Sequence, residues 1–160
     1  MAVPKELWSR IDQVGIVGRD AEAVIASMRA IFGLEPTKRI QTSADRTDAF
    51  YRGRPRVLCA DLIFYRIGEI DLEIICPTAG ASLHHEYLEK HGEGLYHIRF
   101  DVESFDEAVQ AMMERGFPPA MHGTSASNSA ARWAYFDTEP QLGYYVEIIN
   151  LRELRAGEAG

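Results

Sequence analysis

The sequence has little or none of several features that mark specialised classes of protein. Its 160 residues include only two cysteines, Cys59 and Cys76, and both lie in apolar stretches. We therefore expect reduced core residues rather than a disulfide or a metal pair. No run of 18 apolar residues occurs, and the first residues lack the apolar segment of a signal peptide. The protein is expected to be cytoplasmic and to make no contact with a membrane.

Blocks of basic residues are also missing. The chain carries 17 lysines and arginines against 24 acidic residues, a formal net charge of −7, whereas a nucleic-acid-binding surface needs the opposite balance. What is present is an ordinary globular composition, with 46% hydrophobic and 26% charged residues. A chain of this length can bury one sizeable core, so residues 1–160 are expected to form one domain. The expected partner is a small molecule.

One order of predicted elements occurs twice along the chain. Each half begins with a short β-branched strand, continues with a helix of apolar residues at helical spacing, and ends with further strands. The expected strands cover residues 11–17, 38–42, 57–66, 69–76, 96–102, 132–137 and 144–150. The expected helices cover residues 20–32, 83–90 and 105–115. Polar loops are expected over 43–55 and 122–130, and a polar, loose tail after residue 152.

This repeat predicts an α+β protein built from two βαβββ modules. The first module covers about residues 10–77 and the second about residues 95–150, with a linker over 78–94 that holds the short helix. Internal repeats are informative because each unit is one supersecondary structure that packs against its neighbour.

Four polar side chains occupy matching places in the two halves. Gln13 and His97 lie in the first strand of each half, and Glu73 and Glu147 in the last. Because alternate side chains of a strand share a face, a sheet that curls around a groove would bring all four into the groove. Two carboxylates that converge inside a protein are costly unless a cation offsets their charge. This ligand set suits one divalent ion, namely Zn, Ni, Co, Mn or Mg.

Each of these residues also has a simpler explanation. A lone histidine on a strand, such as His97, is often a packed core residue. Glu73 and Glu147 on edge strands would be solvated charges. The recurrence of the polar groups at equivalent positions favours the metal site.

Other polar residues leave two explanations open. Asp61 interrupts an apolar strand, where it either faces water or lines the groove as a general base with a raised pKa. Arg99 and Arg132 either anchor an anionic substrate or pair with surface acids. The remaining histidines are expected in loop or surface roles, with His122 a candidate for substrate contact. These are His84, His85, His91 and His122.

Residues 92–98, with the sequence GEGLYHI, resemble the glycine-rich, metal-binding strand of methylmalonyl-CoA epimerases. Residues 72–77 and 143–149 are similar to the same family. These epimerases belong to the vicinal oxygen chelate superfamily, with glyoxalase I, bleomycin-resistance proteins and extradiol dioxygenases. The resemblance covers about residues 10–150. It implies the vicinal oxygen chelate fold, a cupped eight-stranded mixed sheet of paired βαβββ modules around a metal, and a homodimer.

The resemblance also implies that the metal ligands are Gln13, Glu73, His97 and Glu147. Epimerases usually have histidine at the position of Gln13 and glutamine at the position of Glu73. The set found here is more similar to that of the zinc-type glyoxalase I enzymes. An extradiol dioxygenase is the least expected member, because it needs two histidines and one carboxylate around Fe(II).

The activity implied by the resemblance is metal-dependent abstraction of a proton next to a carbonyl. The metal acidifies the C–H bond and stabilises the enediolate. Glu147 is the expected base, and Asp61, which aligns near the second catalytic acid of epimerases, is expected on the opposite face. Epimerisation of an acyl-CoA such as methylmalonyl-CoA is the leading hypothesis. The alternatives are a glyoxalase I-like lyase acting on a hemithioacetal and a non-catalytic binding or resistance protein.

Overall fold

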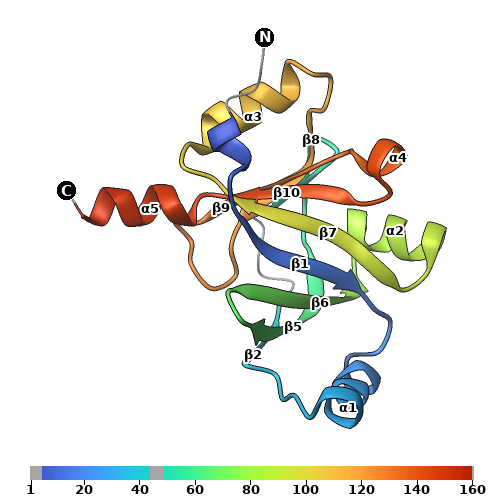
Figure 1. The fold of residues 1–160 in the computed structure, drawn as a ribbon. Helices are drawn as coiled ribbons and strands as arrows, with labels where there is room; N and C mark the ends of the chain where they lie inside the picture. The colour runs from blue at the N-terminus through green and yellow to red at the C-terminus, as the bar shows by residue number, and fades with distance from the viewer. Residues whose placement is uncertain (1–4, 44–48, 160) are drawn as a thin grey trace.

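The computed structural model describes residues 5–43 and 49–159, and one curled mixed sheet forms the body of this part of the chain (Figure 1). The order of strands is β2-β5-β6-β1-β7-β10-β9-β8-β3-β4. The strands are β1 Ile11–Val17, β2 Lys38–Gln41, β3 Ala49–Tyr51, β4 Arg54–Arg56, β5 Cys59–Ile67, β6 Ile70–Ala79, β7 Gly94–Asp101, β8 Pro119–Thr124, β9 Arg132–Phe136 and β10 Tyr145–Ile149. The helices are the 3-10 helix Lys5–Trp8, α1 Ala21–Phe32, α2 Leu83–His91, α3 Phe105–Met113, α4 Glu139–Leu142 and α5 Leu151–Glu158.

The sheet has ten strands in the described residues, where eight were expected. Leaving out β3 and β4, the first half of the chain runs β1, α1, β2, β5, β6. The second half runs β7, α3, β8, β9, β10, so each half has the expected order of strand, helix and three strands. The two additional strands, β3 and β4, form a hairpin within the stretch expected to be a loop over 43–55. This hairpin belongs to the first half in sequence but pairs with β8 of the second half. Residues 44–48 of the expected loop lie outside the described residues.

Two further segments are more regular than the sequence predicted. Strand β8 includes residues 122–124 of the loop expected over 122–130, because its backbone pairs with both β9 and β3. The tail forms α5. The carboxylate of Asp101, a residue 1% exposed, anchors this helix by accepting hydrogen bonds from the Arg152 backbone N–H at 2.8 Å and from Arg155 Nη2 at 2.7 Å.

Helices α1 and α3 cover the outer face of the sheet, whereas residues of α2 pack in an apolar cluster with concave-side residues such as Val17 and Tyr96. Helix α1 begins after Asp20, whose side chain accepts a hydrogen bond from the Ala23 backbone N–H, and ends at Gly33 in the left-handed conformation. Ile25 of α1 packs on the outer side of β5 and β6, and α3 packs in the same way on β9 and β10. No helix of the described residues is long and apolar enough to cross a bilayer.

The first strands of the two halves, β1 and β7, lie side by side in the middle of the sheet (Figure 1). Their antiparallel pairing is irregular at two places, where Asp12 is an extra residue in β1 and Tyr96 an extra residue in β7. A β-bulge re-aims a side chain relative to strict alternation. Tyr96 consequently lies on the concave side together with His97, and Asp12 reaches the concave-side Arg99.

Replacing Asp101 by alanine is expected to lower the free energy of unfolding by about 1–3 kcal/mol, because the first turn of α5 loses a buried hydrogen-bond acceptor. Urea denaturation measures this change. The control is Glu158→Ala at the exposed end of the same helix, expected to stay within about 0.5 kcal/mol of the wild type. Equal stabilities of the two variants would show that Asp101 does not hold α5.

Candidate metal centre

The four central strands place the predicted ligands in two adjacent rows on the concave face. Glu73 of β6 and His97 of β7 flank Gly15 of β1 in one row. Gln13 of β1 and Glu147 of β10 lie in the next row. The rows follow from the strand period of two, which puts residues 13 and 15 on one face.

The four side chains meet at one point. His97 Nε2 lies 2.9 Å from Gln13 Oε1, 3.0 Å from Glu147 Oε2 and 3.6 Å from Glu73 Oε2. All four residues are buried, and His97 has no exposed surface. The structure thus brings together, within one chain, the four residues that the sequence singled out.

This arrangement fits a divalent cation better than it fits a hydrogen-bond network. A neutral imidazole Nε2 carries at most one hydrogen, yet three acceptor oxygens surround it. Glu147 Oε2 is buried and has no hydrogen-bond partner in the described residues. The ligand atoms of Glu73, His97 and Glu147 lie within 4.8 Å of one another and could hold an ion. The Gln13 amide oxygen adds a fourth ligand to a set of hard oxygens and one imidazole.

Burial disfavours the charged forms of these groups when no cation is bound. Burial raises the pKa of Glu73 to about 7, although the Arg99 cation opposes this shift. Burial also raises the pKa of Glu147 well above its usual range, against Arg99 and with the help of the Glu73 charge. The pKa of His97 is lowered by burial and by Arg99, so its ring is neutral. A divalent ion would favour two ionised carboxylates while leaving the imidazole neutral, as a ligand must be.

Two neighbours hold the His97 ring in place. The Tyr135 hydroxyl lies 3.4 Å from Nδ1, where its oxygen can accept a hydrogen bond from the Nδ1–H when Nε2 binds an ion. On the other side is Gly15, where an added Cβ would lie 2.0 Å from His97 Cε1 and 2.1 Å from Nδ1. Glycine at this position therefore makes room for the ring.

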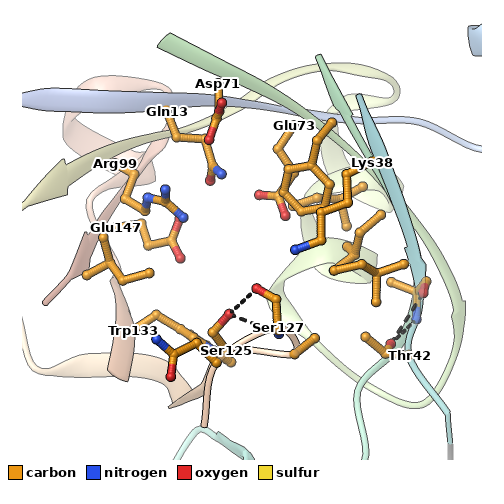
Figure 2. Close-up of a pocket in the computed structure, with 18 of the residues that line it drawn as sticks. Gln13, Lys38, Thr42, Asp71, Glu73, Arg99, Ser125, Ser127, Trp133 and Glu147 are labelled. Atoms are coloured by element: carbon orange, nitrogen blue, oxygen red, sulfur yellow. Dashed lines mark hydrogen bonds between the residues drawn. The ribbon is translucent and has the colours of Figure 1, made fainter. Parts of the chain in front are cut away.

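A buried ion pair lies next to the ligands. Arg99 binds Asp12 through two hydrogen bonds of 2.9 Å, and it lines the cavity beside Glu147 (Figure 2). Arg99 thus pairs with an acid, although with the buried Asp12 rather than a surface one, and it also lines the groove; its expected contact with an anionic substrate stays a prediction. Arg132 does not reach the groove and pairs with the exposed Asp106 at 2.9 Å.

Three of the four proposed ligands, Gln13, Glu73 and Glu147, line a cavity of about 490 Å³. Figure 2 shows Glu73 and Lys38 on one side of it, Arg99 and Glu147 on the other, and Ser125 facing them. One wall, from β2, β5 and β6 and the segment before β5, is apolar. It consists of Ile40, Leu58, Ala60, Leu62, Phe64 and Ile75. A cavity with this volume, an apolar wall and a few polar groups is typical of a small-molecule site.

Asp61 does not reach this cavity. Alternation along β5 directs Ala60 and Leu62 into the cavity and Asp61 to the outer face. There Asp61 accepts a hydrogen bond of 2.9 Å from Arg39 Nε, and the Arg39 hydrogen bonds hold its pKa below the usual range. The expectation that Asp61 lines the groove as a base with a raised pKa is therefore wrong, because an arginine on β2 accounts for its charge.

His84 was expected to have a loop or surface role, but it is buried. It is 8% exposed and lines the cavity. The sequence contained a signal for this position, because Tyr87 and Leu88, three and four residues further on, are buried on the same face of α2. The other histidines lie outside the cavity lining: His85 bonds Ser82, His91 bonds Glu139, and His122 stacks on Phe50.

Residues 12–136 match the family model described as the Glyoxalase/Bleomycin resistance protein/Dioxygenase superfamily. The chain belongs to this superfamily. Among solved structures, a methylmalonyl-CoA epimerase from Mycobacterium tuberculosis is similar with a TM-score of 0.68 at 16% identity, covering 97% of each chain. A Streptomyces coelicolor methylmalonyl-CoA epimerase in complex with 2-nitronate-propionyl-CoA gives a TM-score of 0.65 at 20% identity, covering 89% of this chain and 94% of the other. At these identities the similarity is one of fold.

The similarity to curated sequences is shorter. The uncharacterised protein YqjC of Bacillus subtilis is 36% identical over 55 residues. The match covers 34% of this chain and 39% of that relative, so the chain matches well under half of the relative's length.

Replacing Gly15 by alanine is expected to weaken binding of Zn²⁺ about 10- to 100-fold, because the new methyl group displaces the His97 ring. The free energy of unfolding is expected to fall by about 1–3 kcal/mol. Isothermal titration with Zn²⁺ and urea denaturation measure the two effects. The matched control is Gly18→Ala, where the nearest atoms to an added Cβ are 3.4 Å away. Unchanged Zn²⁺ affinity in the Gly15 variant would contradict the site.

The stability of the chelator-treated protein is expected to fall as the pH rises from about 4.5 to about 7. Glu73 keeps its proton in the folded protein up to about pH 7, whereas the ordinary value is 4.5. Its contribution is therefore fully present below pH 4.5 and is lost as the pH passes the folded pKa. Urea denaturation across this range measures the slope, which Glu73→Gln should reduce. A slope that is unchanged by this substitution would exclude Glu73 as its source.

Proposed function

We propose that this protein is a metal-dependent epimerase or isomerase that moves a proton next to a carbonyl group of a small acyl substrate. The observation that carries the proposal is the convergence of Glu73 and Glu147, which line the cavity, on His97 Nε2. Removal of an α-proton needs an electrophile to acidify the C–H bond and a base beside it. A cation site built from two carboxylates supports both requirements.

The ligands would be Gln13, Glu73, His97 and Glu147, and a divalent ion bound there would supply Lewis acidity toward a substrate carbonyl. Glu147 accepts the α-proton. Its carboxylate lies 3.0 Å from His97 Nε2, and a cation bound there would keep it ionised and able to take up the proton.

Glu73 is the candidate for the second proton-transfer group, in place of Asp61. It reaches His97 from β6, whereas Glu147 reaches it from β10, on the other side of the β1–β7 pair. One carboxylate can thus take a proton from one face of the substrate carbon, and the other can return it to the opposite face. Proton return to the opposite face is epimerisation.

The rest of the cavity supports an acyl substrate with an anionic group. Lys38 brings positive charge from one side, the Asp12-paired Arg99 lines the cavity on the other, and the apolar wall suits an aliphatic portion (Figure 2). Arg99 is fixed by Asp12, so it needs no reorganisation when charge develops near Glu147. The acyl-CoA compound bound to the Streptomyces coelicolor epimerase supports an acyl-CoA as the first substrate to test.

A glyoxalase I-like lyase is the second candidate. The ligand set Gln13, Glu73, His97 and Glu147, with glutamine on β1 and glutamate on β6, favours it. The same abstraction by Glu147 then ends with proton return to the neighbouring carbon. Turnover of the hemithioacetal of methylglyoxal and glutathione discriminates this reaction from epimerisation.

The protein loaded with one equivalent of Zn²⁺, Ni²⁺, Co²⁺, Mn²⁺ or Mg²⁺ is expected to exchange the α-proton of methylmalonyl-CoA with deuterated water. Mass spectrometry measures the exchange, and metal analysis measures the ion content, expected at one per chain. Absence of both exchange and hemithioacetal turnover with every ion would leave a non-catalytic binding protein.

Glu147→Gln is expected to lower the exchange rate about 10²- to 10⁴-fold, because the base is lost. The matched control is Asp61→Asn, a similar change to a buried acid on the outer face of the sheet, expected to keep the rate within about threefold. If the control loses activity as strongly as Glu147→Gln at equal metal content, the assignment of the base fails.

A further inference from the structure

His84 is a polar residue of the cavity that the proton-transfer scheme does not use. It lies in the first turn of α2, and its ring contacts Tyr96 and Tyr135, with centroids 5.1 Å and 5.9 Å away. Tyr135 in turn contacts the ring of His97 at 5.3 Å. His84 is therefore one aromatic ring away from the metal ligands, and it lines the same cavity as Glu147.

The two ring nitrogens of His84 have different surroundings. Nδ1 is sealed from solvent and has no hydrogen-bond partner in the described residues. Nε2 is not sealed in this way, and because His84 lines the cavity, Nε2 is the nitrogen through which we expect the ring to face it. A neutral imidazole carries one ring proton. Placing this proton on Nε2 avoids a buried N–H without an acceptor, and it directs a donor into the cavity.

The surroundings keep this ring neutral. Burial lowers the pKa of His84 to about 3, and the neighbouring His85 adds to the effect. The positive end of the α2 dipole also disfavours a cation in the first turn. A neutral imidazole in such a place acts on a carbonyl by hydrogen bonding rather than by giving up its proton.

Packing alone does not account for a histidine at this position. The surrounding cluster is aromatic, and phenylalanine would fill the space without burying an unpaired nitrogen. A buried polar atom without a partner is rare in native proteins and needs an explanation. The next residue, His85, shows the ordinary arrangement, because its Nδ1 lies 3.0 Å from the Ser82 hydroxyl.

We infer that His84 binds the substrate, donating a hydrogen bond from Nε2–H to a carbonyl, enolate or carboxylate oxygen in the cavity. This inference rests on the proposed function, because it takes the substrate to carry such an oxygen. A fixed donor in a site from which water is excluded stabilises negative charge that develops as the α-proton leaves. His84 therefore contributes to the rate of the reaction as well as to substrate affinity.

The test compares the wild type with three variants, all loaded with Zn²⁺. His84→Phe keeps the packing and removes the donor. His84→Gln restores an N–H near the position of Nε2, and His85→Phe makes the same change outside the cavity. Titration calorimetry with methylmalonyl-CoA measures affinity, and exchange of its α-proton in deuterated water measures kcat and KM.

His84→Phe is expected to lower kcat about 10- to 100-fold, with a smaller change in KM. His84→Gln is expected to recover most of this loss, and His85→Phe to stay within twofold of the wild type. The Tm of His84→Phe should equal or exceed that of the wild type, because an unpaired buried nitrogen is removed. A purely structural histidine would instead give a lower Tm and no rescue by glutamine.

The results separate this inference from the proposed function. If the wild type exchanges the α-proton and His84→Phe exchanges it equally fast, the role of His84 is overturned and the function stands. A second outcome is that the wild type binds methylmalonyl-CoA without exchanging its proton and that, of the three variants, only His84→Phe binds it about tenfold more weakly. The proposed reaction is then overturned, and the role of His84 in substrate binding stands. Imidazole ¹⁵N spectra give a reading without substrate, since a proton on Nδ1 rather than Nε2 would overturn the inference.

Discussion

Two carboxylates buried against one imidazole are the constraint on which the rest of this structure depends. Glu73 and Glu147 come from different halves of the chain, and they converge only because β1 and β7 pair at the centre of the sheet and the sheet curls around their concave side. Without a cation their ionised forms are unfavourable. The neighbouring arginine adds no net charge, because Arg99 is neutralised by Asp12. The carboxyls can stay protonated, as the raised pKa values of Glu73 and Glu147 indicate, or a divalent ion can offset their charge.

The sequence revealed this centre because the ligands repeat. Gln13 and His97 are equivalent in the two halves, as are Glu73 and Glu147, and a strand period of two puts each pair on a predictable face. The hairpin β3–β4 could not be found in the same way. Its partner β8 belongs to the other half, so the pairing depends on contacts between residues far apart in the sequence. Helix α5 was missed because the carboxylate that anchors it, Asp101, lies some 50 residues away along the chain.

Asp61 and His84 show where residue patterns stop being informative about a site. The alternation of side chains along a strand shows which residues share a face of the sheet, but it does not show which face is concave. Asp61 lies on the outer face, where Arg39 binds it. His84 lies on the buried side of α2, a short helix with so many polar residues that its apolar face is hard to recognise in the sequence. Tyr96 adds a third case. Strict alternation separates it from His97, whereas the bulge in β7 places both on the concave side.

The hairpin β3–β4 also forms one edge of the sheet, and its residues determine whether another chain can pair with that edge. Its last strand, β4, consists of Arg54, Pro55 and Arg56, all exposed. Proline presents no N–H to an incoming strand, and the two arginines repel a second copy of the same edge. The opposite rim, β2, begins with Lys38 and Arg39. The composition of both rims therefore disfavours extension of the sheet by strand addition from another copy of the chain.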